Sequence, residues 1–211
     1  MQQVIITRPE QDAASWASAL EDAGFKVSLF PLLDLSDFMT APEAQKACEL
    51  LLQSQAVMFV SANAVRFLAQ ALATTPEWLT HFQGGARAWC TGPGTAAALK
   101  ACGIPAHQID QPSNLAAQLD SESLWQEVLN QVTPGMRVLF IRGADESGAI
   151  AGRDWLAQQL ENAQVQVQAV AAYRRLPTLL SPALQAQASA YVAQDAVWLF
   201  SSSAAIESLM S

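Results

Sequence analysis

The sequence predicts an α/β protein with two similar lobes, in which parallel sheets are flanked by helices and a cleft separates the lobes. Two observations predict this fold class. Short apolar runs alternate regularly with helical patterns along the chain, which is typical of parallel strands covered on both faces. A strand–turn–helix unit also occurs twice, and two long copies of one unit indicate two similar lobes rather than a solenoid.

The repeated unit is recognised by a nearly constant spacing. Its clearest matches, 140 positions apart, join Ala56, Val57, Ser61 and Ala64 to Ala196, Val197, Ser201 and Ala204. Segment 20–27 matches 160–167 at the same offset, whereas Val4 and Arg8 match Val138 and Arg142 at the smaller offset of 134.

The predicted elements follow in strand–helix order. A helical pattern after the first apolar run stops at Gly24, because glycine commonly terminates helices. Thr133-Pro134-Gly135 marks a turn before a later strand. The strands are predicted at 4–7, 25–29, 56–60, 86–90, 137–141, 165–173 and 196–200, and the helices at 14–23, 44–52, 62–72, 94–102, 119–132, 154–163, 182–192 and 204–210.

Composition limits the class of protein. The 211 residues are 51% hydrophobic and 14% charged, which is ample for buried cores. A net charge of −8 and the absence of a basic run argue against nucleic-acid binding. No apolar run reaches the length of a membrane span and the N-terminus lacks a leader pattern, so we expect a cytoplasmic protein with no membrane partner.

The cysteines and histidines do not indicate a metal site. Cys48, Cys90 and Cys102 lie in apolar segments without metal-ligand spacing, and we expect reduced, structural thiols. His81 and His107 lie far apart in unlike contexts, so no metal is expected.

Small hydroxyl residues, glycines and arginines follow several strands, where ligands bind in parallel α/β sheets. Backbone N–H groups at the starts of the following helices favour anions. Each Ser or Thr hydroxyl in these segments has the alternative of being an ordinary helix N-cap. The segments are Thr7-Arg8-Pro9, Ser61-Ala62-Asn63, Thr91-Gly92-Pro93-Gly94-Thr95, Arg142-Gly143 and Ser201-Ser202-Ser203.

Common catalytic and nucleotide motifs are missing. Gly92-Pro93-Gly94-Thr95 lacks a following Gly-Lys-Ser/Thr, and no Gly-x-Gly-x-x-Gly opens a helix after the first strand. No Gly-x-Ser-x-Gly nucleophile elbow occurs.

Taken in order, these segments resemble the uroporphyrinogen-III synthase family from end to end. The motifs that carry the resemblance are Thr7-Arg8-Pro9, Phe59-Val60-Ser61-Ala62-Asn63-Ala64-Val65, Gly92-Pro93-Gly94-Thr95-Ala96-Ala97-Ala98-Leu99, Leu139-Phe140-Ile141-Arg142-Gly143, Gly152-Arg153-Asp154-Trp155-Leu156, Ala172-Tyr173-Arg174-Arg175 and Phe200-Ser201-Ser202-Ser203. The resemblance implies two α/β lobes joined by a pair of extended strands. Residues 1–34 and 176–211 would form a first, discontinuous lobe, and residues 35–175 the second.

The resemblance also implies a reaction. The family converts the linear tetrapyrrole hydroxymethylbilane into uroporphyrinogen III in haem biosynthesis, with loss of water and inversion of ring D. That makes the expected enzyme a cyclising hydro-lyase without a cofactor. We expect a monomer, and transient contact with the preceding pathway enzyme stays open.

Tyr173, carried over from the family's tyrosine in the second crossing, is the expected catalytic residue, as donor to the leaving hydroxyl. The alternative is an aromatic hinge residue with packing value only. The eight carboxylates of the substrate require many N–H donors, hydroxyls and arginines. The expected substrate-binding residues are Thr7, Arg8, Ser61, Asn63, Gly92, Gly94, Thr95, Arg142, Gly143, Arg153, Ser201 and Ser202.

By the repeat offset, a second copy of segment 88–104 would begin near position 228, so we expect the native chain to continue past Ser211. Two other functions fit parts of the sequence. A non-catalytic, two-lobed binding module for a small anion would explain the serine-rich loops but leaves Tyr173 without a task. A flavodoxin-like flavin protein would be yellow when purified.

Overall fold

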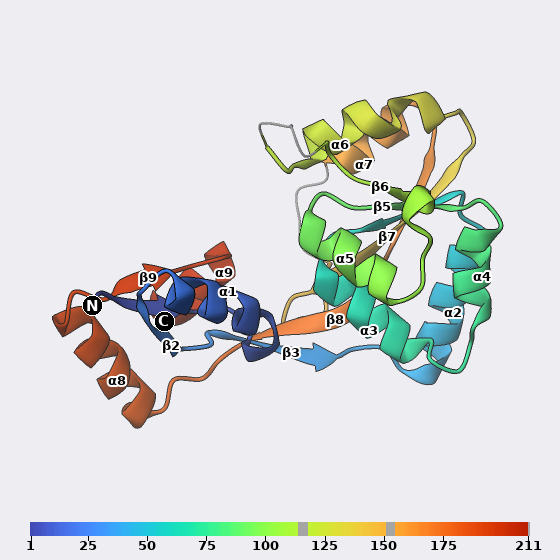
Figure 1. Cartoon of the computed structure of the whole chain (residues 1–211). Coiled ribbons are helices and arrows are strands. Elements are labelled where there is room, and N and C mark those ends of the chain that lie inside the picture. Colours follow the sequence, from blue (N-terminus) through green and yellow to red (C-terminus); the bar gives the residue numbers. More distant parts are fainter. Residues whose placement is uncertain (114–117, 151–154, 211) are drawn as a thin grey trace. The chain divides into compact units, whose positions relative to one another are not determined.

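The chain divides into two compact units in the computed structural model (Figure 1). The structure describes residues 1–113, 118–150 and 155–210. We call Met1–Ser36 with Arg175–Ser211 the split unit, and Asp37–Arg174 the continuous unit. Both contain parallel strands and helices, in agreement with the predicted fold class.

The split unit is built on a three-stranded sheet of order β2-β1-β9, in which both strand pairs are parallel. Three helices and the connecting segments supply the rest of its fold. Ile5 of β1 and Ala205 of α9 are fully or almost fully buried in its core, where Trp198 of β9 packs edge-on against Phe30. The elements are β1 (Gln3–Ile6), α1 (Glu10–Asp22), β2 (Lys26–Leu29), α8 (Pro182–Ala193), β9 (Val197–Leu199) and α9 (Ser203–Met210).

The continuous unit contains most of a six-stranded sheet of order β3-β8-β7-β4-β5-β6. The strand pairings from β8 through β6 are all parallel. β3 and β8 cross the boundary between the units, which lies after Ser36 in β3 and after Arg174 in β8. The strands are β3 (Leu33–Asp37), β4 (Ala56–Phe59), β5 (Arg87–Trp89), β6 (Ile109–Asp110), β7 (Arg137–Ala144) and β8 (Gln166–Pro177).

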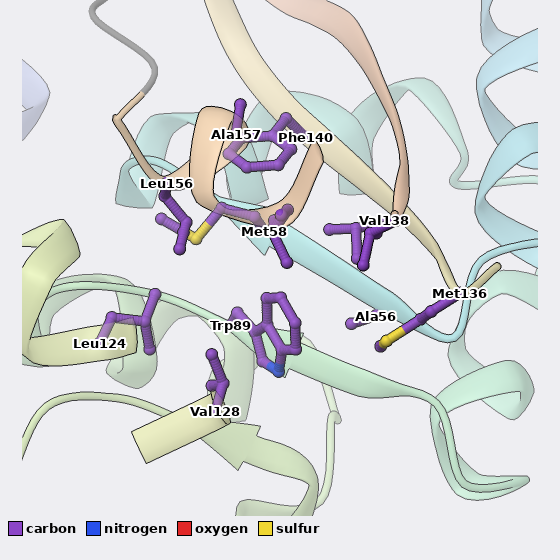
Figure 2. Close-up of a cluster of buried hydrophobic side chains, with 12 residues drawn as sticks. Ala56, Met58, Trp89, Leu124, Val128, Met136, Val138, Phe140, Leu156 and Ala157 are labelled. Carbon is purple, nitrogen blue, oxygen red and sulfur yellow. The ribbon is translucent and has the colours of Figure 1, made fainter. Parts of the chain in front are cut away.

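One face of this sheet packs on α6 and α7 (Figure 2). Met58 of β4, Trp89 of β5 and Phe140 of β7 share this face because side chains alternate along a strand. They meet Leu124 of α6 and Leu156 of α7. The helices are α6 (Ser121–Val128), followed by the 3₁₀ turn Leu129–Gln131, and α7 (Trp155–Asn162).

Helices α2, α3, α4 and α5 cover the opposite face of the sheet, away from α6 and α7 (Figure 1). Phe59 points to this side, and its ring centroid lies 6.4 Å from that of Phe82 in α4. α3 packs against α5, and both begin just after neighbouring strands. The elements are α2 (Ala41–Leu52), α3 (Ala62–Ala71), α4 (Glu77–Gln83), α5 (Pro93–Ala101) and the 3₁₀ turn Ala106–Gln108.

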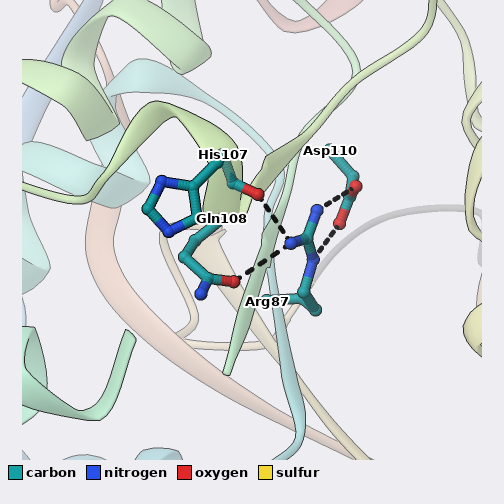
Figure 3. A network of polar contacts seen from close by, with 4 residues as sticks. All are labelled: Arg87, His107, Gln108 and Asp110. Carbon is teal, nitrogen blue, oxygen red and sulfur yellow. Dashed lines mark hydrogen bonds and ion pairs between the residues drawn. The ribbon is translucent and has the colours of Figure 1, made fainter. Parts of the chain in front are cut away.

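Arg87 fastens the outer strands of the sheet together (Figure 3). Its Nε donates to Asp110 of β6 at 2.8 Å, and Nη2 donates to the second oxygen of the same carboxylate. Nη1 donates to the His107 carbonyl at 2.7 Å and to Gln108 Oε1 at 3.0 Å. A planar guanidinium therefore links β5 to the turn before β6 and to β6 itself.

Most predicted elements are present, with shifted ends. The strand predicted at 137–141 runs to Ala144, and the strand predicted at 165–173 runs to Pro177. The helix predicted at 119–132 is an α-helix only over Ser121–Val128. α4 and β6 were not predicted, and the family resemblance implied a pair of extended joining strands without giving bounds for β3. β6 has only two residues, and strands so short carry almost no periodic signal.

Candidate functional site

Residues expected at the site gather where the strands of the continuous unit end. Ser61 follows β4, residues 92–95 follow β5, Gly143 lies near the end of β7, and Tyr173 lies on β8. We call this set the carboxyl-end site. Parallel α/β sheets bind ligands at this end, since the following helices point their N-termini there.

Tyr173 reaches this site because of an irregularity in the sheet. Arg142 pairs with Ala171, but the next residue of β7, Gly143, pairs with Tyr173. Ala172 is therefore an extra residue, which makes a β-bulge. In a regular ladder, with Ala172 paired to Gly143, strict alternation would place Tyr173 on the same face as Ala171 and Arg142. The bulge turns the tyrosine to the α3 face instead.

Gly143 leaves the space that the tyrosine ring occupies. A Cβ on Gly143 would lie 2.6 Å from Tyr173 Cζ, 2.7 Å from Cε2 and 2.9 Å from the phenol oxygen. These distances are far inside van der Waals contact. Because β7 lies between β8 and β4 in the sheet, a residue without a side chain at position 143 lets the ring extend toward β4.

The far end of the tyrosine meets the start of α3. Its phenol oxygen lies 3.2 Å from Ser61 Oγ, and either group can donate this hydrogen bond. Ser61 is also the N-cap of α3, where its Oγ accepts from the Ala64 N–H at 3.1 Å. Phe67 of the same helix stacks on the Tyr173 ring, with centroids 5.3 Å apart and planes 20° apart. Tyr173 is only 5% exposed in this setting.

The start of α5 adds backbone donors beside α3. Gly92 is the N-cap of α5, and a Cβ on Gly92 or Gly94 would meet no atom within 4 Å. Packing within the chain thus gives no reason for glycine at either position. The Thr95 side chain is buried, and its backbone N–H donates to the Gly92 carbonyl at 3.1 Å.

Cys90 at the end of β5 does not supply a reactive thiolate to this site. The side chain is fully buried, and this burial raises the pKa of its thiol to about 11. A thiol with such a pKa stays protonated near neutral pH and is a poor nucleophile.

The structure does not bring Arg142 to the same face as Tyr173. The guanidinium of Arg142 lies 4.7 Å from the centre of the Phe140 ring, on the side of the sheet covered by α6 and α7. Two residues apart on a strand, Arg142 and Phe140 share a face. Asn63 lies in the first turn of α3 and accepts a hydrogen bond from Arg66 Nη2.

The other expected residues lie in the split unit or outside the described chain. Thr7 is fully buried and donates through Oγ1 to the Leu199 carbonyl at 2.9 Å. Arg8 lies 4.8 Å above the ring of Trp16. Ser201 is exposed, and Ser202 Oγ accepts from the Ala205 N–H at 3.3 Å. Arg153 lies outside the described residues.

The two helix caps correct one detail of the repeat. Ser61 was matched to Ser201, but the residue that accepts the capping hydrogen bond in the second copy is Ser202. α3 begins at Ala62 and α9 at Ser203, so the helix starts are 141 positions apart. Three consecutive serines at 201–203 hid this one-residue difference.

Phe67 is the neighbour of Tyr173 that sequence reasoning missed. Its helix presents an apolar stripe at Ala64, Val65 and Leu68, all fully buried, and Phe67 lies at the margin of that stripe. A large aromatic residue at such a margin, six positions after a predicted cap, is a weak signal for a contact beside the core.

Neither a metal centre nor a membrane span is found in the described part of the chain. No three His, Cys, Asp or Glu side chains at described positions are arranged to hold a metal ion. Within residues 1–113, 118–150 and 155–210, no helix has the length and apolar character needed to cross a bilayer.

Comparison with known proteins gives a consistent result. The family model of uroporphyrinogen-III synthase HemD matches residues 14–211. A curated uroporphyrinogen-III synthase from Chlorobaculum parvum is 29% identical over 154 residues, which are 71% of this chain and 56% of that protein. The chain thus spans little more than half the length of this relative.

Solved structures share the fold at low sequence identity. A mutant uroporphyrinogen III synthase from the extreme thermophile Thermus thermophilus gives a TM-score of 0.60 at 18% identity, covering 100% of this chain and 76% of that one. Uroporphyrinogen-III synthetase from Helicobacter pylori 26695 gives a TM-score of 0.58 at 14% identity, covering 100% and 78%.

Proposed function

The chain belongs to the uroporphyrinogen-III synthase family, and we propose that the protein cyclises hydroxymethylbilane to uroporphyrinogen III. The observation that carries this proposal is the contact between Tyr173 and Ser61 at the start of α3. It joins the residue expected to act on the leaving hydroxyl to a helix N-terminus, which favours anionic groups such as substrate carboxylates.

Tyr173 is the proton donor in this proposal. When Ser61 donates to the phenol oxygen, the phenol O–H is left to donate to a ligand. The phenol passes its proton to the terminal hydroxyl of the substrate, and water leaves. The resulting azafulvene cation is attacked by the substituted carbon of ring D, and a spiro intermediate forms.

The remaining steps reorganise the pyrroles. The spiro intermediate breaks and recloses with ring D inverted, and the proton released at final closure returns to the phenolate. One water is lost overall. Since the pyrroles supply most of the reactivity, the main task of the protein is to hold the chain in one shape.

Carboxylate arms are held by helix starts and small residues in this proposal. The N-termini of α3 and α5 lie next to each other at the carboxyl-end site. The open space at Gly92 and Gly94 supports close approach of a ligand to the backbone N–H groups there. Ser61 and Thr95 would add hydroxyls, and Thr7, Arg8, Arg142, Arg153, Ser201 and Ser202 remain proposed contacts.

The test is a coupled assay on the full-length gene product. Hydroxymethylbilane is generated in place, and the uroporphyrin isomers are separated after oxidation. Predominant isomer III supports the proposal. A folded protein that yields only isomer I, as in the reaction without protein, overturns it, and retained affinity for hydroxymethylbilane would then favour a non-catalytic binding module.

A further inference from the structure

Four features surround the ring of Tyr173, and only Ser61 offers it a hydrogen bond among the contacts described. The bulge at Ala172 selects the sheet face, and Gly143 leaves room for the ring. Phe67 stacks on the ring. Two of these residues, Gly143 and Phe67, present no polar side chain to a substrate.

We propose that Gly143 and Phe67 are positioning residues that act on the reaction through Tyr173. This inference rests on the proposed function for its kinetic part. Gly143 was expected to bind substrate directly. Its burial, together with the 2.6 Å that would separate a Cβ at this position from Tyr173 Cζ, assigns it instead to the tyrosine ring.

The residue at position 143 decides where the phenol oxygen can lie. A methyl group at position 143 cannot coexist with the ring at 2.6 Å, so the ring must move. The oxygen must then leave its position 3.2 Å from Ser61 Oγ. A displacement of about 1 Å at a reacting group can lower turnover about 100-fold.

Phe67 acts from the helix side. A stacked aromatic pair at 5.3 Å restricts the tilt of the tyrosine ring. Phe67→Leu removes the flat surface but keeps an apolar side chain, whereas Phe67→Tyr keeps the stacked ring. The two substitutions therefore separate ring stacking from hydrophobic burial.

A stability cycle tests the contact without any assay of activity. Gly143→Ala is expected to lower the midpoint of thermal unfolding by about 5 °C in the wild-type background. In the Tyr173→Ala background, the same substitution is expected to change the midpoint by less than about 1 °C, because the ring is gone. Gly94→Ala, which adds a methyl in open space, is the steric control for stability.

A kinetic cycle tests the positioning role. Gly143→Ala is expected to lower kcat about 100-fold with KM changed less than about 3-fold. Gly143→Ala with Tyr173→Ala is expected to match Tyr173→Ala alone within about 2-fold. Phe67→Leu is expected to lower kcat about 10-fold, and Phe67→Tyr to restore it. Phe82→Leu, which removes a buried ring that contacts Phe59 and Trp78, controls for general loss of packing.

Each outcome decides the inference. If Gly143→Ala raises KM equally with and without the Tyr173 ring, Gly143 contacts substrate itself and the positioning role is wrong. If Phe82→Leu lowers kcat as much as Phe67→Leu, ring stacking has no specific effect. A wild-type protein without isomer III overturns the proposed function, while the stability cycle still decides whether Gly143 positions Tyr173.

Discussion

The phenol oxygen of Tyr173 lies 3.2 Å from the hydroxyl oxygen of Ser61, although 112 positions separate the two residues in sequence. Ser61 Oγ takes part in two hydrogen bonds, since it also accepts from the Ala64 N–H at the start of α3. Movement of either the helix start or the end of β8 would therefore break this contact.

Tyr173→Phe is expected to lower kcat about 100-fold with little change in KM, because the phenol O–H is lost while the ring and its contacts stay. The measurement is the coupled isomer III assay over a range of hydroxymethylbilane concentrations. Tyr191→Phe in the split unit, whose oxygen accepts from Gln187 at 3.0 Å, is the matched control and should keep full turnover. An unchanged rate for Tyr173→Phe would remove this residue from catalysis.

Ser61→Ala is expected to lower both stability and turnover. Loss of the N-cap hydrogen bond should cost about 1 kcal/mol of unfolding free energy, and loss of the partner of Tyr173 should lower kcat. Ser181 caps α8 in the same way, accepting from the Leu184 N–H at 3.3 Å, but has no tyrosine contact among those described. Ser181→Ala should therefore cost similar stability in urea unfolding and leave kcat unchanged. Equal kinetic effects of the two substitutions would show that Ser61 acts only as a cap.

Arg87→Lys is expected to destabilise the continuous unit although the charge is kept. A lysine ammonium cannot reproduce the donors that Arg87 directs to Asp110, His107 and Gln108 (Figure 3). Because the Asp110 side chain is only 13% exposed, loss of its donors should cost about 2 kcal/mol. Urea unfolding measures this cost, and Arg137→Lys at the start of β7 is an exposed control. A cost below about 0.5 kcal/mol for Arg87→Lys would contradict the structural role of this network.

Glu43→Gln is expected to destabilise the protein in a pH-dependent way. Hydrogen bonds from the Thr40 hydroxyl and backbone N–H lower the pKa of the Glu43 carboxyl from its ordinary value of 4.5. A carboxyl with a lowered pKa in the folded state stabilises the protein above its unfolded-state pKa, and this contribution is lost as pH falls through the folded value. The stability difference between wild type and variant should be full at about pH 7 and shrink below pH 4.5. A constant difference from about pH 7 to about pH 3 would disprove the charge-dependent cap.

Cys90 is expected to resist alkylation in the folded protein. Burial raises the pKa of its thiol to about 11, and its side chain is fully buried. Cys102 is partly exposed, so it should react faster although burial also raises its thiol pKa. Iodoacetamide labelling at about pH 8, followed by peptide mass spectrometry, measures both rates, and labelling in urea supplies the reference. Faster reaction at Cys90 than at Cys102 would show that the end of β5 opens readily.

Sequence reasoning located the strands and helices of the duplicated units because their periodicity is local. The apolar run at 56–60 and the cap at Ser61 carry their own signals, and both are present in the structure. It gave no bounds to β3, because Leu33–Asp37 alternates apolar and polar residues over only four positions and the strand forms by pairing with β8. Helix α4 follows Thr75-Pro76 and is only seven residues long, too short for a clear helical period.

The candidate site was predicted in part. Ser61 was predicted because it follows directly after a strand, and Tyr173 was predicted from the family resemblance. The structure brings these two residues together. Strand-end position does not say which sheet face a side chain takes, and this is why Arg142 was grouped with residues on the opposite face. The face depends on strand register, and the bulge that alters it at Ala172 has no signature in a single sequence.

The bulge at Ala172 also gives β8 one residue more than its partner strand needs. Deleting Ala172 would place Tyr173 directly after Ala171, so Tyr173 would pair with Gly143 in a regular ladder and stay on the α3 face. A slip of the register that paired Ala172 with Gly143 would instead turn Tyr173 to the face of Arg142. In this strand, the loss of one codon is therefore a milder event than a slip of the register, and homologues are expected to include chains that lack this one residue.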